Sequence, residues 1–300
     1  MKKIMCIVSC IFVCSAALVN SAKAFAQEGG WGYKNNRIAV SADGNEQPDM
    51  EYVGKYRTAD PDDWGATPAA LAMLAKLKKQ SNLVHYSYNN FMPSPPHTTI
   101  RNYMQEGIDG SISRWGFNRD IFFDVGIHKQ KAVTHLKNEI AKSTAADPLY
   151  FINMGPSEFL YQAVKLTVEQ GQKDALSHVY VISHSNYNDN HLRRPEHKTI
   201  DDVLAFSNNK INFNRIKDQN DRNNPNKGWS SAGKVSKDWS VWEWMKDHKD
   251  PDVNWLWESM KKHKHNKPDI SDAGMVFYLL TGDADGNPEK FKQFIGTSIQ

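Results

Sequence analysis

Cysteine is scarce in this chain and is confined to its beginning. Cys6, Cys10 and Cys14 are the three cysteines of the 300 residues, and all lie in an apolar N-terminal stretch. Without that stretch the chain has no thiol, so disulfide bonds are excluded as a source of stability. The sequence also lacks internal repeats and low-complexity blocks. Stability must therefore come from a packed core, with a bound metal ion as a further contribution.

Long apolar runs and an excess of charge are also missing from most of the chain. Beyond the N-terminal stretch, no segment is apolar enough to cross a membrane. The formal net charge is +3, and Lys2, Lys3 and Lys23 account for all of it. This balance argues against a nucleic-acid-binding surface. With 40% hydrophobic and 24% charged residues, the composition is that of a globular protein with a large core.

The first 26 residues have the composition of a leader for export. Lys2 and Lys3 precede a nearly continuous apolar stretch over residues 4–19, and small residues at 22–26 fit an A-x-A cleavage pattern. We therefore predict a cleaved signal peptide over residues 1–26 and a periplasmic or secreted protein. The alternative is an N-terminal membrane anchor, which the small residues disfavour. Residues 27–300 are then expected to form a single domain, with no membrane contact after cleavage.

Short apolar runs alternate with helical patterns along this domain. Strands are expected at 37–40, 83–88, 149–153, 178–182 and 211–216, and helices at 66–79, 129–142, 157–169, 200–206 and 273–280. Such alternation is typical of an α/β fold with a mainly parallel sheet flanked by helices. Polar residues follow several of these strands, among them Asp43, Asn90 and His184. Because parallel strands end at the same edge, these loops should meet in a site there.

Acidic residues gather after the first strand and before the next helix. Asp43 follows the strand, and Asp62 and Asp63 precede the apolar helical segment. Hard cations such as calcium bind six to eight oxygen ligands, mostly carboxylates and carbonyls. The alternative is helix capping, because aspartate is favoured at a helix N-terminus. One aspartate would satisfy that role, so from these residues alone the two explanations stay open.

Four segments in order resemble a known family. A strand leads into Asp43-Gly44-Asn45, and Asp62-Asp63 follows after an insertion. A second strand ends in Asn89-Asn90, a third ends in Gly155-Pro156 before a helix, and Asp272 opens an apolar helix. This pattern is similar to that of the nucleoside hydrolases, the inosine-uridine preferring N-ribohydrolases. The chain resembles a divergent, secreted member of that family. It departs from that family in the insertion at 46–61 and in Ser271, where the family has histidine.

The resemblance implies a calcium-dependent hydrolase of N-glycosidic or related glycosidic bonds. Asp43 would be the general base, and the metal ligands would be Asp43, Asp62, Asp63, Glu158 and Asp272, with Glu158 where the family offers a backbone carbonyl. The substrate contacts would be Asn45, Asp62, Asn90, His184, Asn186 and Asn188. The bound partner would be a small-molecule sugar or nucleoside. The sequence leaves open whether the protein forms a homo-oligomer. Because Ser271 is a poor acid, His184 or His191 is a candidate for the acid that protonates the leaving group. The alternative is that both are ordinary neutral histidines without this role.

Tryptophan is concentrated near the C-terminus. Six of the nine tryptophans lie at 229, 239, 242, 244, 255 and 257. Core packing of a helical segment explains most of them, with one or two lining a pocket. Two other classes of protein stay open: a calcium-dependent sugar- or nucleoside-binding protein without turnover, and an interaction protein that docks through this Trp-rich segment.

Overall fold

The computed structural model describes residues 29–44, 62–93, 101–190, 192–220, 228–229, 238–262 and 268–300. The strands are β1 (Arg37–Ala42), β2 (Leu83–Tyr88), β3 (Phe122–Asp124), β4 (Leu149–Met154), β5 (Val179–Ser183) and β6 (Asn212–Arg215). The α-helices are α2 (Asp63–Lys76), α3 (Tyr103–Trp115), α4 (Val125–Ala141), α5 (Glu158–Glu169), α6 (Asn186–Asn190), α7 (Ile200–Phe206), α8 (Pro251–Met260), α9 (Ala273–Thr281) and α10 (Pro288–Ile295). Short 3₁₀ helices are η1 (Gly30–Gly32), η2 (Arg119–Ile121), η3 (Lys173–His178) and η4 (Ser240–Met245).

The strands of the described residues form one sheet with the order β3-β2-β1-β4-β5-β6, and every pairing in it is parallel. The chain winds outward from β1 to β3, then returns through α4 to β4 on the other side of β1. This reversal between β1 and β4 is the point at which open parallel sheets usually bind their ligands. The expected α/β fold with a mainly parallel sheet flanked by helices is thereby confirmed.

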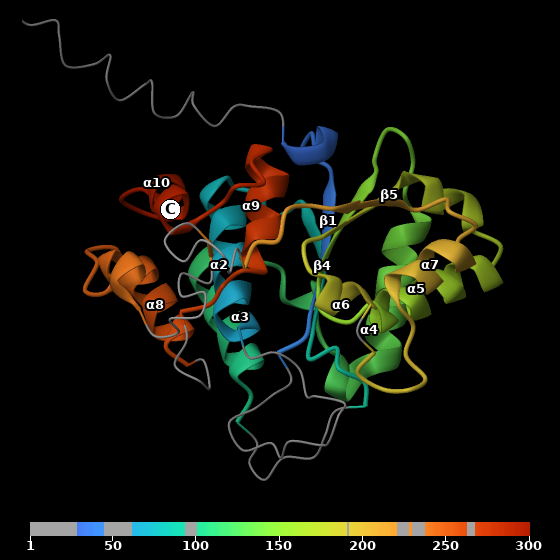
Figure 1. Ribbon diagram of the computed structural model, residues 1–300, viewed down its shortest axis with the longest axis horizontal. Coiled ribbons are helices and arrows are strands. Elements are labelled where there is room, and N and C mark those ends of the chain that lie inside the picture. Colours follow the sequence, from blue (N-terminus) through green and yellow to red (C-terminus); the bar gives the residue numbers. More distant parts are fainter. Residues whose placement is uncertain are drawn as a thin grey trace, which may run out of the picture.

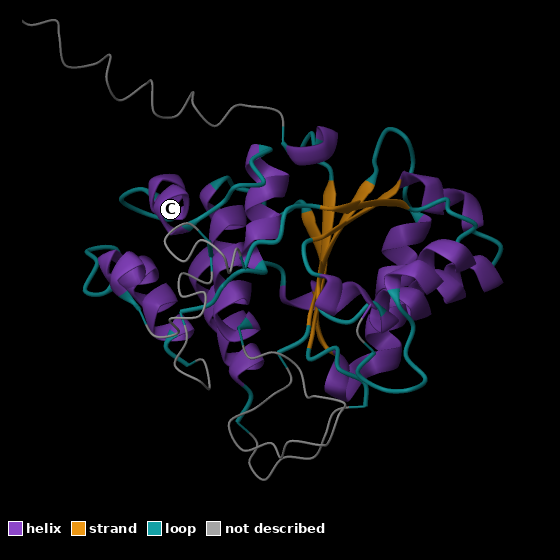
Figure 2. Ribbon diagram, in the orientation of Figure 1, coloured by secondary structure: helices purple, strands orange, loops and turns teal. Residues whose placement is uncertain are grey.

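Helices cover both faces of the sheet (Figures 1 and 2). On one face lie α2, α3, α8, α9 and α10, and on the other lie α4, α5 and α7. Each face has its own apolar core, one built around α2 and α9 and the other around α4 and α5. Strands β1 and β4 are buried on both faces of the sheet. Because both faces are covered, the sequence of each strand is a nearly continuous apolar run.

Helix α2 lies in the middle of its layer and is buried on all sides. Its residues from Asp63 to Ala75 are buried, and most of them are alanine, glycine or other apolar residues. Small side chains let neighbouring helices approach closely: a Cβ added at Gly107 of α3 would lie 3.2 Å from Pro68 of α2. The helix begins at Asp63 rather than at the expected Ala66, so the acidic pair Asp62-Asp63 forms its first turn.

The Trp-rich segment belongs mainly to the core. Trp229, Trp239, Trp242 and Trp257 are buried, whereas Trp244 and Trp255 are partly buried against the same cluster. The indole of Trp229 donates a hydrogen bond to Gln219 Oε1 at 3.0 Å. Packing therefore accounts for most of these side chains. In the described part of the chain, no helix combines the length and the apolar character that a membrane span requires.

Candidate functional site

Three buried carboxylates meet at the carboxyl edge of the sheet. Asp62 and Asp63 come from the start of α2 and Asp272 from the start of α9, and one oxygen of each lies within 4.8 Å of the others. Asp63 is fully buried, and Asp62 and Asp272 are nearly so. Tyr86 lies close enough to feel this charge, because burial, Asp63 and Asp272 together raise the pKa of its hydroxyl well above 10. We call Asp62, Asp63 and Asp272 the acidic group.

The loop after β1 is fixed to the start of α2. The backbone N–H of Asp43 donates to Asp63 Oδ2 at 2.7 Å, and the indole of Trp64 donates to the carbonyl of Gly44 at 2.8 Å. Gly44 has a φ of +59°, and a Cβ there would lie 2.4 Å from the sulfur of Met104. Only glycine fits this turn without strain. The predicted base Asp43, which is 1% exposed, is thus held beside the acidic group.

Asp272 is held by a buried histidine from the end of β5. His184 Nε2 lies 2.5 Å from Asp272 Oδ1. On the other side of the ring, Nδ1 lies 3.3 Å from Asp218 Oδ1 and 3.2 Å from the backbone nitrogen of Gln219. Burial alone would lower the pKa of His184, but hydrogen bonds to and charges of Asp218 and Asp272 outweigh burial and raise it to about 9.

Both ring nitrogens of His184 are therefore used within the protein. When protonated, the ring donates to Asp272 and Asp218; when neutral at Nδ1, it accepts from the N–H of Gln219. The ring orients Asp272 in either state, as outer hydrogen bonds commonly do for metal-binding carboxylates. The geometry gives His184 a positioning role, and its expected sugar contact stays a prediction.

The loops after β2 and β4 bring an amide next to Asp43. Asn90 Nδ2 donates to Ser41 Oγ at 2.5 Å, whereas Asn90 Oδ1 is buried and accepts no hydrogen bond from the residues that the structure describes. A Cβ added at Gly155 would lie 2.7 Å from Asn90 Oδ1 and 3.0 Å from Asp43 Cβ. The glycine of the predicted Gly-Pro turn thus allows the β4 loop to approach both side chains. A buried acceptor of this kind suits a ligand hydroxyl group.

A buried arginine lies beside Asp43 and is not among the residues predicted from the sequence. Arg193 is fully buried, and its Nη2 lies 3.8 Å from Asp43 Oδ2 and 3.0 Å from Asn188 Oδ1. Its guanidinium also stacks on Tyr187 with its carbon 4.0 Å from the ring centroid. At this distance the positive charge of Arg193 attracts the carboxylate of Asp43. The predicted substrate residue Asn188 thereby contacts the site through Arg193.

The acidic group fits a hard divalent cation. Calcium binds oxygen at about 2.3–2.6 Å, so two ligands of one ion lie at most about 5 Å apart, a limit that the 4.8 Å spread of these oxygens meets. All donors of the group are carboxylate oxygens, which suit calcium or magnesium better than soft metals. Burying three carboxylates together is costly unless a positive charge compensates them. Asp62, Asp63 and Asp272 could therefore hold the predicted calcium ion, with Asp43 adjacent.

Other predicted site residues lie apart from the acidic group or outside the described chain. The carboxylate of Glu158 accepts hydrogen bonds from Gln162 Nε2 at 2.6 Å and from the backbone of Lys198 at 2.8 Å, and it faces another cavity. Asn186 is exposed and accepts from the side-chain amide of Asn190. Asn45 and His191 fall outside the described residues. The metal role of Glu158 and the substrate role of Asn186 stay predictions.

These features define an α/β protein of the doubly wound, parallel-sheet class with a candidate cation site at its point of reversal. The chain is 30% identical over 265 residues to "Uncharacterized protein P22" of Formosa agariphila. The aligned region covers 83% of this chain and 85% of that protein. The chain therefore belongs to the same family as that protein. No protein-family model matches the chain, and no solved structure matches it.

Proposed function

We propose that this protein is a calcium-dependent hydrolase that cleaves N-glycosidic bonds of nucleosides or related glycosidic bonds. The observation that supports this most strongly is the meeting of Asp62, Asp63 and Asp272 beside Asp43 at the point of reversal of the sheet. Calcium held there would orient a water molecule and two sugar hydroxyls and make that water more acidic. The role of the chain is then to bind the sugar, to take up a proton and to exclude solvent.

Asp43 is suited to act as the general base. It is buried, its backbone is fixed to Asp63, and the guanidinium of Arg193 lies 3.8 Å from its carboxylate. Asn90 Oδ1 is suited to accept a hydrogen bond from a sugar hydroxyl, since no group in the described segments donates to it. His184 would keep Asp272 in place rather than protonate the leaving group, because both of its nitrogens are already engaged. Export through a cleaved leader over residues 1–26 remains part of this proposal.

The test measures calcium binding and sugar release on the same preparations. Isothermal titration with calcium and release of free ribose from inosine, uridine, adenosine and cytidine are compared with and without a chelator. We expect Asp63→Asn to abolish calcium binding and release. Asp43→Asn should retain calcium but lower the release rate by about 10²–10⁴, the usual contribution of a general base. Asp201→Asn, on the exposed side of α7, is the matched control and should leave both unchanged.

The outcomes separate the competing functions. Calcium binding without ribose release from any nucleoside, even at high enzyme concentration, would support a binding protein in place of an N-ribohydrolase. Absence of calcium binding to the wild-type protein would overturn the proposal as a whole.

A further inference from the structure

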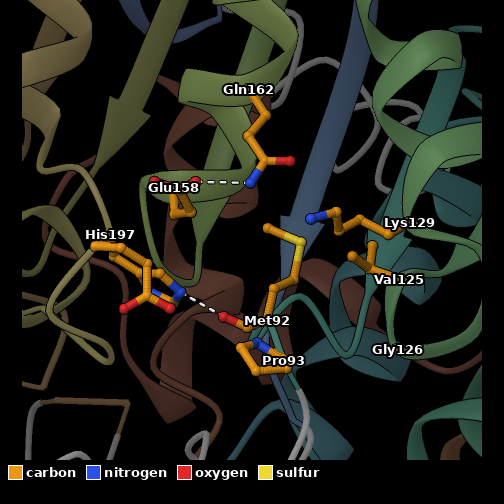
Figure 3. Close-up of a pocket in the computed structure, with 9 residues that line it drawn as sticks. Met92, Pro93, Val125, Gly126, Lys129, Glu158, Gln162 and His197 are labelled. Carbon is orange, nitrogen blue, oxygen red and sulfur yellow. Dashed lines mark hydrogen bonds between the residues drawn. The ribbon is translucent and has the colours of Figure 1, made fainter.

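A second cavity lies at the same edge of the sheet, on the α4 and α5 side (Figure 3). Its volume is about 380 Å³, within the range of small-molecule sites. It is formed by the loop after β2, the first turns of α4 and α5, and the segment before α7. The lining residues are Met92, Pro93, Val125, Gly126, Lys129, Glu158, Gln162, Glu196 and His197.

This cavity is separate from the acidic group but uses the same loops. None of Asp43, Asp62, Asp63 and Asp272 lines it. Met92 lies two residues after Asn90, and Glu158 lies three residues after Gly155. Each of these loops therefore contributes one residue beside Asp43 and another to the cavity. The two sites share the loops that follow β2 and β4.

His197 forms part of the cavity wall. The residue is only 6% exposed, and its Nε2 contacts the backbone carbonyl of Met92 (Figure 3). A carbonyl can only accept, so Nε2 must carry a proton. Nδ1 is buried inside the wall, and burial lowers the pKa of His197 below 6.5, so the ring is neutral at pH 7. His197 therefore adds no charge to the cavity.

The polar side chains that line the cavity are mostly acceptors. The side chains of Glu158 and Gln162 lie together through the 2.6 Å hydrogen bond from Gln162 Nε2, which leaves Gln162 Oε1 as an acceptor. Glu196 adds a second carboxylate, and Lys129 is the one cationic side chain among the lining residues. Two carboxylates disfavour an anion, and the number of acceptors favours a ligand that brings several donors. A ring with several hydroxyl groups has this property.

The walls also include apolar surface suited to such a ring. Met92, Pro93 and Val125 line one part of the cavity, and the side chain of Met92 projects between Lys129 and His197 (Figure 3). Carbohydrates carry donors around their rim and apolar C–H groups on their faces. Sites with apolar walls and a few placed polar groups fix the orientation of such ligands.

We propose that this cavity is a binding subsite for an uncharged sugar ring, next to the predicted calcium site. The existence of the cavity is independent of the catalytic role, but its assignment to a ring of the same substrate rests on the proposed function. Gln162 Oε1 and Glu158 accept hydrogen bonds from ring hydroxyls, and Lys129 donates one.

The experiment measures sugar binding with the calcium site disabled. Saturation-transfer NMR on the full protein in excess chelator is run with D-ribose, D-xylose, D-glucose, D-galactose and the anionic D-glucuronate as probes. We expect at least one neutral sugar to bind at millimolar concentration. Gln162→Leu and Lys129→Met should each weaken that binding by about threefold to tenfold, the effect of one lost hydrogen bond. Lys165→Met, an exposed position elsewhere on α5, is the charge-matched control and should not change it.

Asp63→Asn distinguishes this proposal from the proposed function. Neutral-sugar binding that persists in Asp63→Asn and weakens in Gln162→Leu supports the subsite, whatever the calcium titration shows. Loss of binding in Asp63→Asn with no effect of Gln162→Leu would place the sugar at the acidic group and overturn the subsite. Absence of binding by every neutral sugar, or binding of D-glucuronate alone, would overturn it as well.

Discussion

At the scale of single residues, the site gathers polar groups that are buried beside Asp43. Within the described part of the chain, no group donates to the buried oxygen of Asn90, and Arg193 is buried with its charge 3.8 Å from Asp43. A buried polar group without a partner costs about 1–3 kcal/mol, so such groups in a native protein call for an explanation. Ligand binding supplies one here, since a hydroxyl group would satisfy Asn90. The lack of a side chain at Gly155 lets the loop after β4 pack directly against Asn90.

Gly155→Ala is expected to lower the free energy of unfolding by about 1–3 kcal/mol, because its Cβ would overlap Asn90 and Asp43. Urea unfolding monitored by circular dichroism measures this. The double variant Gly155→Ala with Asn90→Ala should be less destabilised than the sum of the single variants, by about 0.5–3 kcal/mol. Strict additivity would mean that the backbone moves away and that the close approach does not matter.

At the scale of elements, β2 and α4 are joined by a histidine pair. His85 on β2 is fully buried, stacks with Phe123 and Phe159, and has its Nδ1 3.0 Å from Nδ1 of His135 on α4. Burial first, and then the neighbouring histidine, lower the pKa of His85 well below 6.5; burial also lowers that of His135. The folded protein therefore keeps His85 neutral under conditions in which a free histidine takes up a proton.

The pair predicts a loss of stability at mildly acidic pH. As the pH falls through about 6.5 the unfolded chain binds a proton at His85 and the folded chain does not, so the free energy of unfolding decreases. The decrease approaches about 1.4 kcal/mol per pH unit for one such group. His85→Phe should flatten this dependence in urea titrations between about pH 7.5 and about pH 5. The exposed His128→Gln is the control, and an equal slope in wild type and His85→Phe would refute the assignment.

The elements show where sequence patterns succeed. The ten expected strands and helices all occur, with ends shifted by a few residues. The helices α3, α6, α8 and α10 and the strand β3 were not predicted. Met104, Ile108 and Ile112 of α3 recur at helical spacing, but Gly107 and Gly110 weaken its helical signal. Strand β3 has only three residues, too few for a recognisable pattern. The start of α2 was placed too late because Pro68 lies within the helix rather than at its beginning.

The site was predictable only where the chain order indicated it. The sequence placed Asp43 and Asn90 at strand ends and Asp62, Asp63 and Asp272 at helix starts, and the parallel sheet brings these together. Their roles in metal and substrate binding stay predictions. Arg193 and the pairing of His184 with Asp272 were not predictable, since they depend on how the segment after α6 and the turn at Asp218 fold back. No local spacing encodes such contacts.

At the scale of the whole molecule, the acidic group joins two distant parts of the chain. Asp63 opens the central helix α2, and Asp272 opens α9, which packs against α2. Three carboxylates gathered there repel one another unless a cation is present. Binding of such a cation should therefore stabilise the fold as a whole rather than one loop.

Calcium is expected to raise the free energy of unfolding by about 2.7 kcal/mol when its concentration is about 100 times Kd. Urea unfolding with calcium and with chelator measures this difference. Asp63→Asn should abolish the difference, and Asp201→Asn should keep it. A calcium effect of the same size in Asp63→Asn would show that the ion binds elsewhere.

The reversal of winding between β1 and β4 also bears on how this family can diversify. The chain that leaves β1 proceeds to α2 on one face, and the chain that leaves β4 proceeds to α5 on the other. Gly44 follows β1 and Asp62 precedes α2, so both ends of the 45–61 connection lie beside the acidic group. The pairings of β1 and the buried helix α2 lie outside that connection. A change in its length would therefore alter the surroundings of the site and leave the scaffold intact.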